Sequence, residues 1–131
     1  MERTRQAIAY LDTHVVVWLY AGEITRLGTK AKQAIEQHDL YFSPLVELEL
    51  KYLHEVNKLT VNANDILKEL AGTIGLKIRH NSFSLVTNYA LKMSWTRDLF
   101  DRLITAEAAI HNDLLITSDR RILQHYEYAV W

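Results

Sequence analysis

The organisation of the chain is decided by residues 7–20, which read AIAYLDTHVVVWLY. Residues 7–11 form a short apolar run that suits a buried strand, and residues 15–20 are apolar as well. One strand covering both runs would be far longer than the usual five or six residues or so. We therefore expect a strand that ends at Leu11, a break at Asp12-Thr13, and a helix through residues 15–20, although its valines are poor helix formers.

Helices and strands alternate along the rest of the chain. This alternation predicts an α/β fold, a single three-layer α/β/α domain with a short central parallel sheet. We expect this domain to span residues 1–131, with residues 1–6 as an N-terminal extension. The first two expected helices are 28–37 and one that is capped by Ser43 and has Pro44 in its first turn. The next are 65–71, capped by Asn64 and ended near Gly72, then 82–93, one from Asp98 or Leu99 to about His111, and a helical turn at 119–124. The expected strands are 40–42, 76–78, 114–117 and 128–131.

The composition excludes several classes of function. The chain of 131 residues has no cysteine, which rules out disulfides, thiolate zinc sites and a cysteine nucleophile. No apolar run approaches the roughly 18 residues that span a membrane, and the charged start is not followed by a signal-like stretch, so we expect a cytoplasmic protein without membrane association. Fifteen basic and sixteen acidic residues give a net charge of -1. Because non-specific nucleic-acid binders carry a basic surplus, any nucleic-acid ligand must be held by a local patch.

Two aspartates follow predicted strands directly. Asp12 closes the first strand, and Asp119 comes two residues after the strand at 114–117. In parallel α/β sheets, ligands bind beyond the carboxyl ends of the strands, so both side chains are expected at that edge. Each also has a simpler interpretation, because Asp119 in Thr117-Ser118-Asp119 suits an ordinary helix cap and an aspartate after a strand is common in unrelated proteins.

Two further carboxylates lie on predicted helices at positions where a solvated charge is unexpected. Glu49 shares a helical face with Leu45, Leu48, Tyr52 and Val56, which we expect to meet the core. A carboxylate on such a face needs a partner, either a salt bridge or a metal ion. Asp101 precedes an alanine-rich stretch that implies close packing on the sheet. Asp101 and the nearby Asp98 are also placed to stabilise a helix N-terminus, which for Asp98 is as good an explanation as function.

Four ionised carboxylates gathered in one pocket would repel one another. At about 5 Å and an effective dielectric constant near 20, each pair costs on the order of 3 kcal/mol. The pocket therefore needs cations, or some of its carboxyl groups must stay protonated. A donor set made only of oxygen atoms suits Mg²⁺ or Mn²⁺.

The same residues resemble the motifs of PIN domains of the VapC toxin type. Leu11-Asp12-Thr13-His14 resembles the first motif, and residues 43–53 resemble the second, with the family's glutamate at Glu49. Residues 97–104 resemble the third, with Asp101 at the metal-binding position and Asp98 at a second acidic position. Residues 115–119 resemble the fourth, with Asp119 in the acidic place. Leu99 stands where many relatives have proline, and the residues before the first strand are an unusual addition.

The resemblance implies a metal-dependent endoribonuclease, the toxin of a type II toxin–antitoxin pair. Asp12, Glu49, Asp101 and Asp119 would be the catalytic and metal-binding residues for Mg²⁺ or Mn²⁺, and Asp98 is a further candidate ligand. The implied partners are an RNA substrate such as tRNA or rRNA, a cognate antitoxin that blocks the acidic pocket, and a second copy of the chain in a homodimer.

Other polar residues near the motifs have two possible roles each. Arg97, Arg102, Arg120 and Arg121 flank the acidic motifs and are candidates for gripping phosphates, while Arg102 can equally pair with Asp98 across one turn. For Thr13, Thr117 and Ser118 we favour caps and turn hydrogen bonds over support of the carboxylates. For His14 we favour a hydrogen-bonded structural role over metal binding.

Two rival functions stay open. A non-catalytic PIN-like module that binds RNA or protein would use the same fold, although its expected signature, loss of an acidic residue, is missing. An aspartate-nucleophile phosphatase or dehalogenase also places an aspartate after the first strand. Those enzymes want a second aspartate two residues later, where this chain has His14, and no lysine occupies a convincing partner motif.

Overall fold

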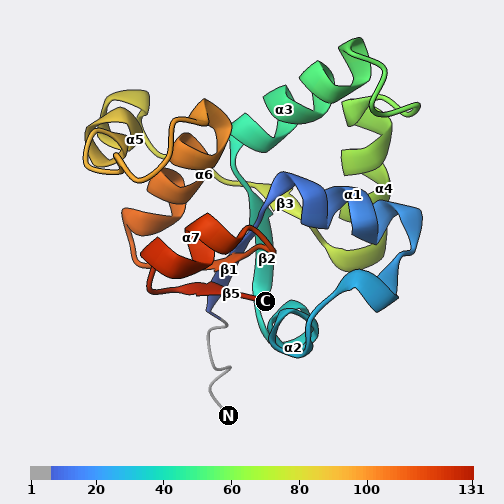
Figure 1. The fold of residues 1–131 in the computed structure, drawn as a ribbon. Coiled ribbons are helices and arrows are strands. Elements are labelled where there is room, and N and C mark those ends of the chain that lie inside the picture. Colours follow the sequence, from blue (N-terminus) through green and yellow to red (C-terminus); the bar gives the residue numbers. More distant parts are fainter. Residues whose placement is uncertain (1–6) are drawn as a thin grey trace.

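Five parallel strands form the centre of the molecule in a computed structural model that describes residues 7–131 (Figure 1). The predicted N-terminal extension, residues 1–6, lies outside the described residues. The strands lie in the order β3-β2-β1-β4-β5, and every neighbouring pair is parallel. The prediction of a short central parallel sheet is therefore confirmed. The strands are β1 (Ile8–Leu11), β2 (Asp39–Phe42), β3 (Lys77–Ile78), β4 (Leu114–Ile116) and β5 (Ala129–Val130).

The direction of the chain across the sheet reverses beside β1. From β1 the chain moves outward through β2 to β3, and it then returns to the other side of β1 to form β4 and β5. In the register of the central pair, Leu11 lies opposite Ile116. The carboxyl ends of β1 and β4 thus meet at the switch point of the sheet, which is where open α/β sheets bind their ligands.

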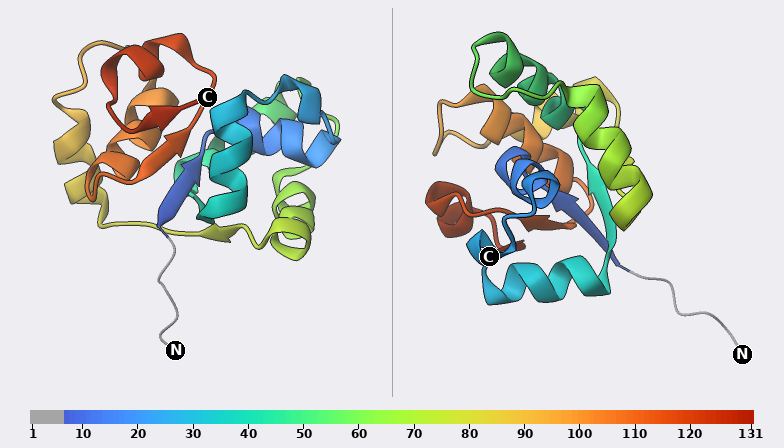
Figure 2. Two further views of the ribbon diagram at one scale, coloured as in Figure 1. Left: turned by 90° about the horizontal axis from the view of Figure 1, so that it is seen from below. Right: turned by 90° about the vertical axis from the view of Figure 1, so that its right-hand side faces the viewer.

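Helices cover both faces of the sheet and complete the three predicted layers. Helices α1, α2 and α4 lie on one face, and α5 and α6 lie on the other (Figure 2, left). Central strand β1 is consequently buried on both sides, and Ala9, Tyr10 and Leu11 have no exposed surface. The helices are α1 (Thr13–Ala21), the short 3-10 helix η1 (Ile24–Arg26), α2 (Thr29–Gln37), α3 (Pro44–Glu55), α4 (Ala63–Ile74), α5 (Phe83–Ala90), α6 (Leu99–Ala109) and α7 (Arg120–His125).

The buried face of α3 differs from the predicted one. Leu48, Tyr52 and Val56 are exposed over 56%, 49% and 42% of their surfaces, whereas Val46 and Leu50 are fully buried. Helix α3 extends outward from the carboxyl edge of the sheet (Figure 1), and it packs against α1, α4 and α6 along a stripe that includes Val46 and Leu50. An apolar helix allows two overlapping stripes at three-and-four spacing, and the sequence pattern alone did not distinguish them.

Several helix ends also differ from the prediction. The cap of α4 is Asn62, whose side chain accepts a hydrogen bond from the Asp65 amide at 2.9 Å, and not Asn64. The same helix continues through Gly72 and ends at Gly75, which has a φ of 70° and supplies the left-handed conformation common after a helix. Within the described part of the chain, no helix has the length and apolar character needed to cross a membrane.

Candidate metal centre

Asp12 is the best-anchored acidic residue at the switch point. It follows β1 and caps α1, and its side chain is only 5% exposed. One carboxylate oxygen accepts a hydrogen bond from the Thr13 amide at 2.8 Å, and the other accepts one from the Thr117 hydroxyl at 2.6 Å. These two donors, one from each side of the junction between β1 and β4, fix the orientation of the carboxylate.

Asp119 is held at the same edge by the loop after β4. Its amide donates to the Thr117 hydroxyl oxygen at 3.0 Å, so Thr117 links Asp119 to Asp12. The Asp119 side chain caps α7 by accepting a hydrogen bond from the Ile122 amide at 3.0 Å. Asp119 is therefore a helix cap, as the simpler interpretation had it. It is also linked to the carboxylate of Asp12 through the Thr117 hydroxyl.

Glu49 reaches the site from the second turn of α3. The Thr13 hydroxyl donates a hydrogen bond of 2.5 Å to a Glu49 carboxylate oxygen, across 36 positions of sequence. Thr13 is fully buried directly after Asp12, so this contact ties α3 to the start of α1. The preference for plain caps and turns at Thr13 and Thr117 was wrong, because both hydroxyls support site carboxylates.

Asp101 and Asp98 come from the start of α6. Asp98 caps the helix by accepting a hydrogen bond from the Asp101 amide at 3.0 Å, and Asp98 itself is exposed. Asp101 lies in the first turn and is partly buried. Helices α1, α6 and α7 thus begin at the site, and their positive N-terminal ends favour negative charge there.

The pKa values of Asp12, Glu49 and Asp101 are all raised, and each is influenced by the charges of other carboxylates of the cluster. Burial raises the pKa of Asp101 to about 7, and neighbouring negative charges add to the rise. Burial likewise raises the pKa of Asp12 and the pKa of Glu49, and the hydrogen bonds from Thr117 and Thr13 oppose these changes. The charges acting on Asp101 come from four carboxylates: Asp12, Asp98, Asp119 and Glu49.

No salt bridge joins these carboxylates to a basic side chain within residues 7–131. The ion pair found there joins Arg26 and Glu23 at 2.6 Å, away from the cluster. No three acidic or histidine side chains of the described residues already converge as a metal ligand set. The candidate metal ligands are nonetheless all carboxylate oxygen atoms. A bound divalent cation would relieve the repulsion between the negative charges of these carboxylates. By this chemistry the residues fit Mg²⁺ or Mn²⁺.

The basic residues near the motifs have other contacts than predicted. Arg102 donates through Nε to the Ala90 carbonyl at 2.7 Å and through Nη2 to the Leu91 carbonyl at 3.4 Å, so it binds the C-terminal end of α5. It neither pairs with Asp98 nor is free to grip phosphate. Arg97 donates to the Ser94 carbonyl at 2.6 Å. Arg120 and Arg121 are exposed and keep their predicted role as candidates.

His14 is also placed differently from the prediction. Its side chain is exposed, its ring lies 6.1 Å from the ring of Trp18, and it makes no hydrogen bond to any described residue. Its charge lowers the pKa of Asp12 and that of Glu49, although burial dominates both. His14 is therefore a neighbour of the carboxylates and not a structural histidine.

Glu107 is a polar residue that sequence reasoning did not single out. It lies between Ala106 and Ala108 on α6 and is only 1% exposed. Its carboxylate contacts Ser43, the cap of α3, and Asn81, which precedes α5. The one signal in the sequence was its place within a stretch of alanines already expected to pack closely.

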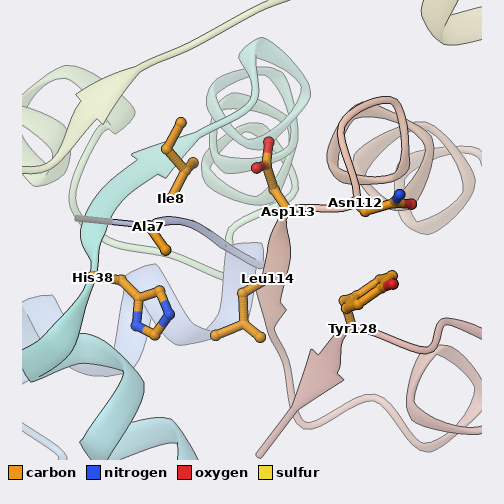
Figure 3. A pocket seen from close by; sticks show the side chains of 7 residues that line it. All are labelled: Ala7, Ile8, His38, Asn112, Asp113, Leu114 and Tyr128. Atoms are coloured by element: carbon orange, nitrogen blue, oxygen red, sulfur yellow. The ribbon is translucent and has the colours of Figure 1, made fainter. Parts of the chain in front are cut away.

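A hollow at the opposite edge of the sheet contains none of the candidate site residues. It has a volume of about 440 Å³, and its lining comes from the amino ends of the strands and the adjoining turns (Figure 3). The cluster and this hollow are therefore separated by the length of the strands. The lining residues are Ala7, Ile8, His38, Asn112, Asp113, Leu114 and Tyr128.

Comparisons with known proteins match the chain along most of its length. The model of the PIN domain family matches residues 9–128. Ribonuclease VapC22 of Mycobacterium tuberculosis (strain ATCC 25618 / H37Rv) is 36% identical over 121 residues, which cover 88% of this chain and 89% of that protein.

Solved structures share the fold at lower sequence identity. VapBC2 from Rickettsia felis, bound to a DNA fragment from its promoter, matches with a TM-score of 0.67 and 18% identity, covering 94% of this chain and 96% of that one. A toxin–antitoxin complex from Klebsiella pneumoniae matches with a TM-score of 0.63 and 20% identity, with the same coverage. VapBC-1 from nontypeable Haemophilus influenzae matches with a TM-score of 0.56 and 16% identity, covering 89% and 90%.

Proposed function

The chain belongs to the PIN-domain family, and from this membership we propose that it is a metal-dependent endoribonuclease that hydrolyses RNA phosphodiester bonds. The observation that carries the proposal is the cluster of carboxylates at the switch point, where burial and neighbouring carboxylates raise the pKa of Asp12, Glu49 and Asp101 and no salt bridge forms to a described basic residue. The similarity to a protein named as a ribonuclease supports the choice of RNA as substrate.

Asp12, Asp101 and Asp119 would hold Mg²⁺ or Mn²⁺, with Glu49 completing the set and Asp98 as a further ligand at its rim. When bound, such an ion lowers the pKa of its water and neutralises charge on the scissile phosphate. Thr117 keeps Asp12 in place and favours its ionised form, which is the form that binds a cation. Thr13 does the same for Glu49.

We propose that the protein is the toxin of a toxin–antitoxin pair and acts in the cytoplasm on tRNA or rRNA. The neighbouring solved structures are toxin–antitoxin complexes, which supports a protein antitoxin as partner. A basic side chain of that partner would neutralise the carboxylate cluster. The exposed apolar residues Leu48 and Tyr52 on α3 and Val56 directly after it support contact with a protein, including a second copy of the chain. Light scattering of the isolated chain would measure whether it is a dimer.

The test is cleavage of bacterial tRNA and rRNA by purified protein, with EDTA, Mg²⁺ or Mn²⁺. The Asp12→Asn variant keeps an oxygen acceptor for the Thr13 amide but lacks the charge. Asp113→Asn is the matched control, because Asp113 is also a partly buried carboxylate whose pKa burial raises, yet it lies at the opposite edge. We expect discrete, metal-dependent fragments from the wild type and Asp113→Asn, and none from Asp12→Asn.

Two other outcomes contradict the proposal. Cleavage that survives both EDTA and Asp12→Asn means a contaminant or a mechanism without this site. Absence of cleavage together with absence of Mn²⁺ binding by calorimetry favours the non-catalytic module that binds RNA or protein.

A further inference from the structure

The buried carboxylate of Glu107 connects three separate segments of the chain. Its Oε1 accepts a hydrogen bond from the Ser43 hydroxyl at 3.1 Å. Its Oε2 accepts two from Asn81, at 2.9 Å from the amide and 2.8 Å from the side-chain nitrogen. Glu107 forms no ion pair with any described residue. Burying a charge without a counter-ion is costly even when hydrogen bonds satisfy its oxygens, so this arrangement needs an explanation beyond packing.

The position of these hydrogen bonds relative to the carboxylate cluster supplies one. Ser43 is the cap of α3, and Glu49 follows it by six residues on the same helix. Glu107 lies on α6, six residues after Asp101. The Ser43–Glu107 hydrogen bond therefore joins the two helices that carry Glu49 and Asp101.

The chemistry of the contacts demands an acceptor at Oε2, whereas the Ser43 hydroxyl beside Oε1 can donate or accept a hydrogen bond. The Asn81 amide and side-chain nitrogen are donors, and the Ser43 oxygen also accepts from the Leu45 amide at 3.2 Å. The neighbouring Tyr10 has its pKa raised by burial first and then by the negative charge of Glu107. Glutamine keeps an oxygen for Asn81 and can donate to Ser43, whereas leucine fills similar space with neither function.

We propose that Glu107 is a positioning residue of the metal centre: by binding Ser43 and Asn81 it sets the angle between α3 and α6 and so the separation of Glu49 and Asp101. This inference rests on the proposed function for its consequence in catalysis. Six helical residues span about 9 Å, so a rotation of about 5° at the Ser43–Glu107 contact moves either carboxylate by about 0.8 Å. Supports of metal ligands typically change metal affinity or activity by about 10- to 100-fold when removed.

The first measurement needs neither metal nor RNA. The chain has no cysteine, so spin labels can be placed at the exposed positions Lys51 on α3 and Leu99 on α6 through K51C and L99C. The distance between the labels is then measured by electron paramagnetic resonance in the metal-free protein. We expect the distribution to broaden or shift in Glu107→Leu and to stay close to the wild type in Glu107→Gln. An unchanged distribution in a folded Glu107→Leu overturns the inference.

The second measurement determines Mn²⁺ binding and the kinetics of RNA cleavage in protein without spin labels. For Glu107→Leu we expect the Mn²⁺ dissociation constant to rise about tenfold and kcat to fall about 10- to 100-fold, with KM changed less than about threefold and substantial rescue by Glu107→Gln. Leu70→Ala on α4 is the control for lost stability, since Leu70 is 3% exposed and takes no part in the hydrogen bonds of Glu107. Equal losses in Glu107→Leu and Leu70→Ala would assign Glu107 to general stability alone.

Further outcomes separate this inference from the proposed function. If the wild type neither binds Mn²⁺ nor cleaves RNA, the proposed function fails, and the label distances still decide whether Glu107 sets the angle. If Glu107→Leu does not fold, Asn81→Ala takes its place, because it removes one donor and keeps the backbone amide. We expect it to raise the Mn²⁺ dissociation constant about threefold, and no change would count against the inference.

Discussion

Replacing Asp101 by asparagine is expected to stabilise the metal-free protein while weakening its binding of divalent cations. Burial and the surrounding carboxylates raise the pKa of Asp101 from 3.8 to about 7 in the folded state. The folded protein therefore holds this proton more tightly than the unfolded chain does. The contribution of the protonated Asp101 carboxyl to the free energy of unfolding is complete below pH 3.8, and it is lost as the pH rises through about 7. Asparagine has no charge to lose, so the variant escapes this penalty.

The size of the effect follows from the change in pKa. An increase from 3.8 to about 7 corresponds to about 4 kcal/mol at about 1.4 kcal/mol for each pKa unit. Asp101 is only partly buried, so screening by solvent reduces the figure to about 1–2 kcal/mol at pH 8. At pH 5 the folded-state carboxyl is still protonated, and the advantage of Asp101→Asn is expected to be smaller.

Urea denaturation in EDTA at pH 5 and pH 8 measures this effect. Asp39→Asn is the control, because Asp39 is exposed at the opposite edge of the sheet and its substitution should change stability by less than about 0.5 kcal/mol. Saturating Mn²⁺ should stabilise the wild type, by about 2.7 kcal/mol at 100 times the dissociation constant, but not Asp101→Asn. A midpoint for Asp101→Asn at or below that of the wild type at pH 8 would refute the account of repulsion among these carboxylates.

Three further variants, at Thr117, Gly28 and Gly72, test the local surroundings of these residues. Thr117→Val removes the hydrogen bond that lowers the pKa of Asp12, so we expect the acidic limb of the pH–kcat profile to move to higher pH, with Thr117→Ser restoring it; an unmoved limb in Thr117→Val would contradict this role. Gly28→Ala places a Cβ 2.5 Å from the Trp131 carbonyl carbon, and we expect a loss of about 1–3 kcal/mol in thermal or urea unfolding. Gly72→Ala adds an atom in open space inside α4, and it should instead increase the free energy of unfolding by about 0.5–1 kcal/mol. Similar effects in both glycine variants would show that the chain relieves the close approach at Gly28 at little cost.

The parts of the fold that were predictable are those in which one local rule dominates. Residues 9–11 are fully buried and Ile8 is partly buried, and a continuous apolar run of that length suits a central parallel strand. The end of β1 at Leu11 followed from the same reasoning, and β4 ends at Ile116, one residue before the predicted end. The edge of the sheet at which Asp12 and Asp119 lie followed from these two strands. A helix start with Ser43 as cap and Pro44 next is similarly local, and both occur as expected.

The parts that were not predictable depend on which elements lie side by side. Glu49 was singled out on a helical face that proves to be exposed at Leu48 and Tyr52, so the residue was reached through a partly wrong argument. The contacts of Arg102 with the end of α5 require knowledge of how α5 and α6 pack. Glu107 looks like an ordinary surface charge until Ser43 and Asn81 are brought next to it from 64 and 26 positions away.

The hydrogen bond between Thr117 and Asp12 closes a loop of 105 positions and has a consequence for the timing of synthesis. During translation, Asp12 leaves the ribosome long before Thr117 and Asp119 have been made. Strand β1 also pairs with β4 on one side, and this pairing cannot form before β4 has been made. The carboxylate cluster cannot assemble on a partial chain. Because Asp119 belongs to the proposed site, we expect the proposed ribonuclease activity only after the segment that follows β4 has been made, when the parts of the chain that carry Asp12, Glu49 and Asp101 have already been translated.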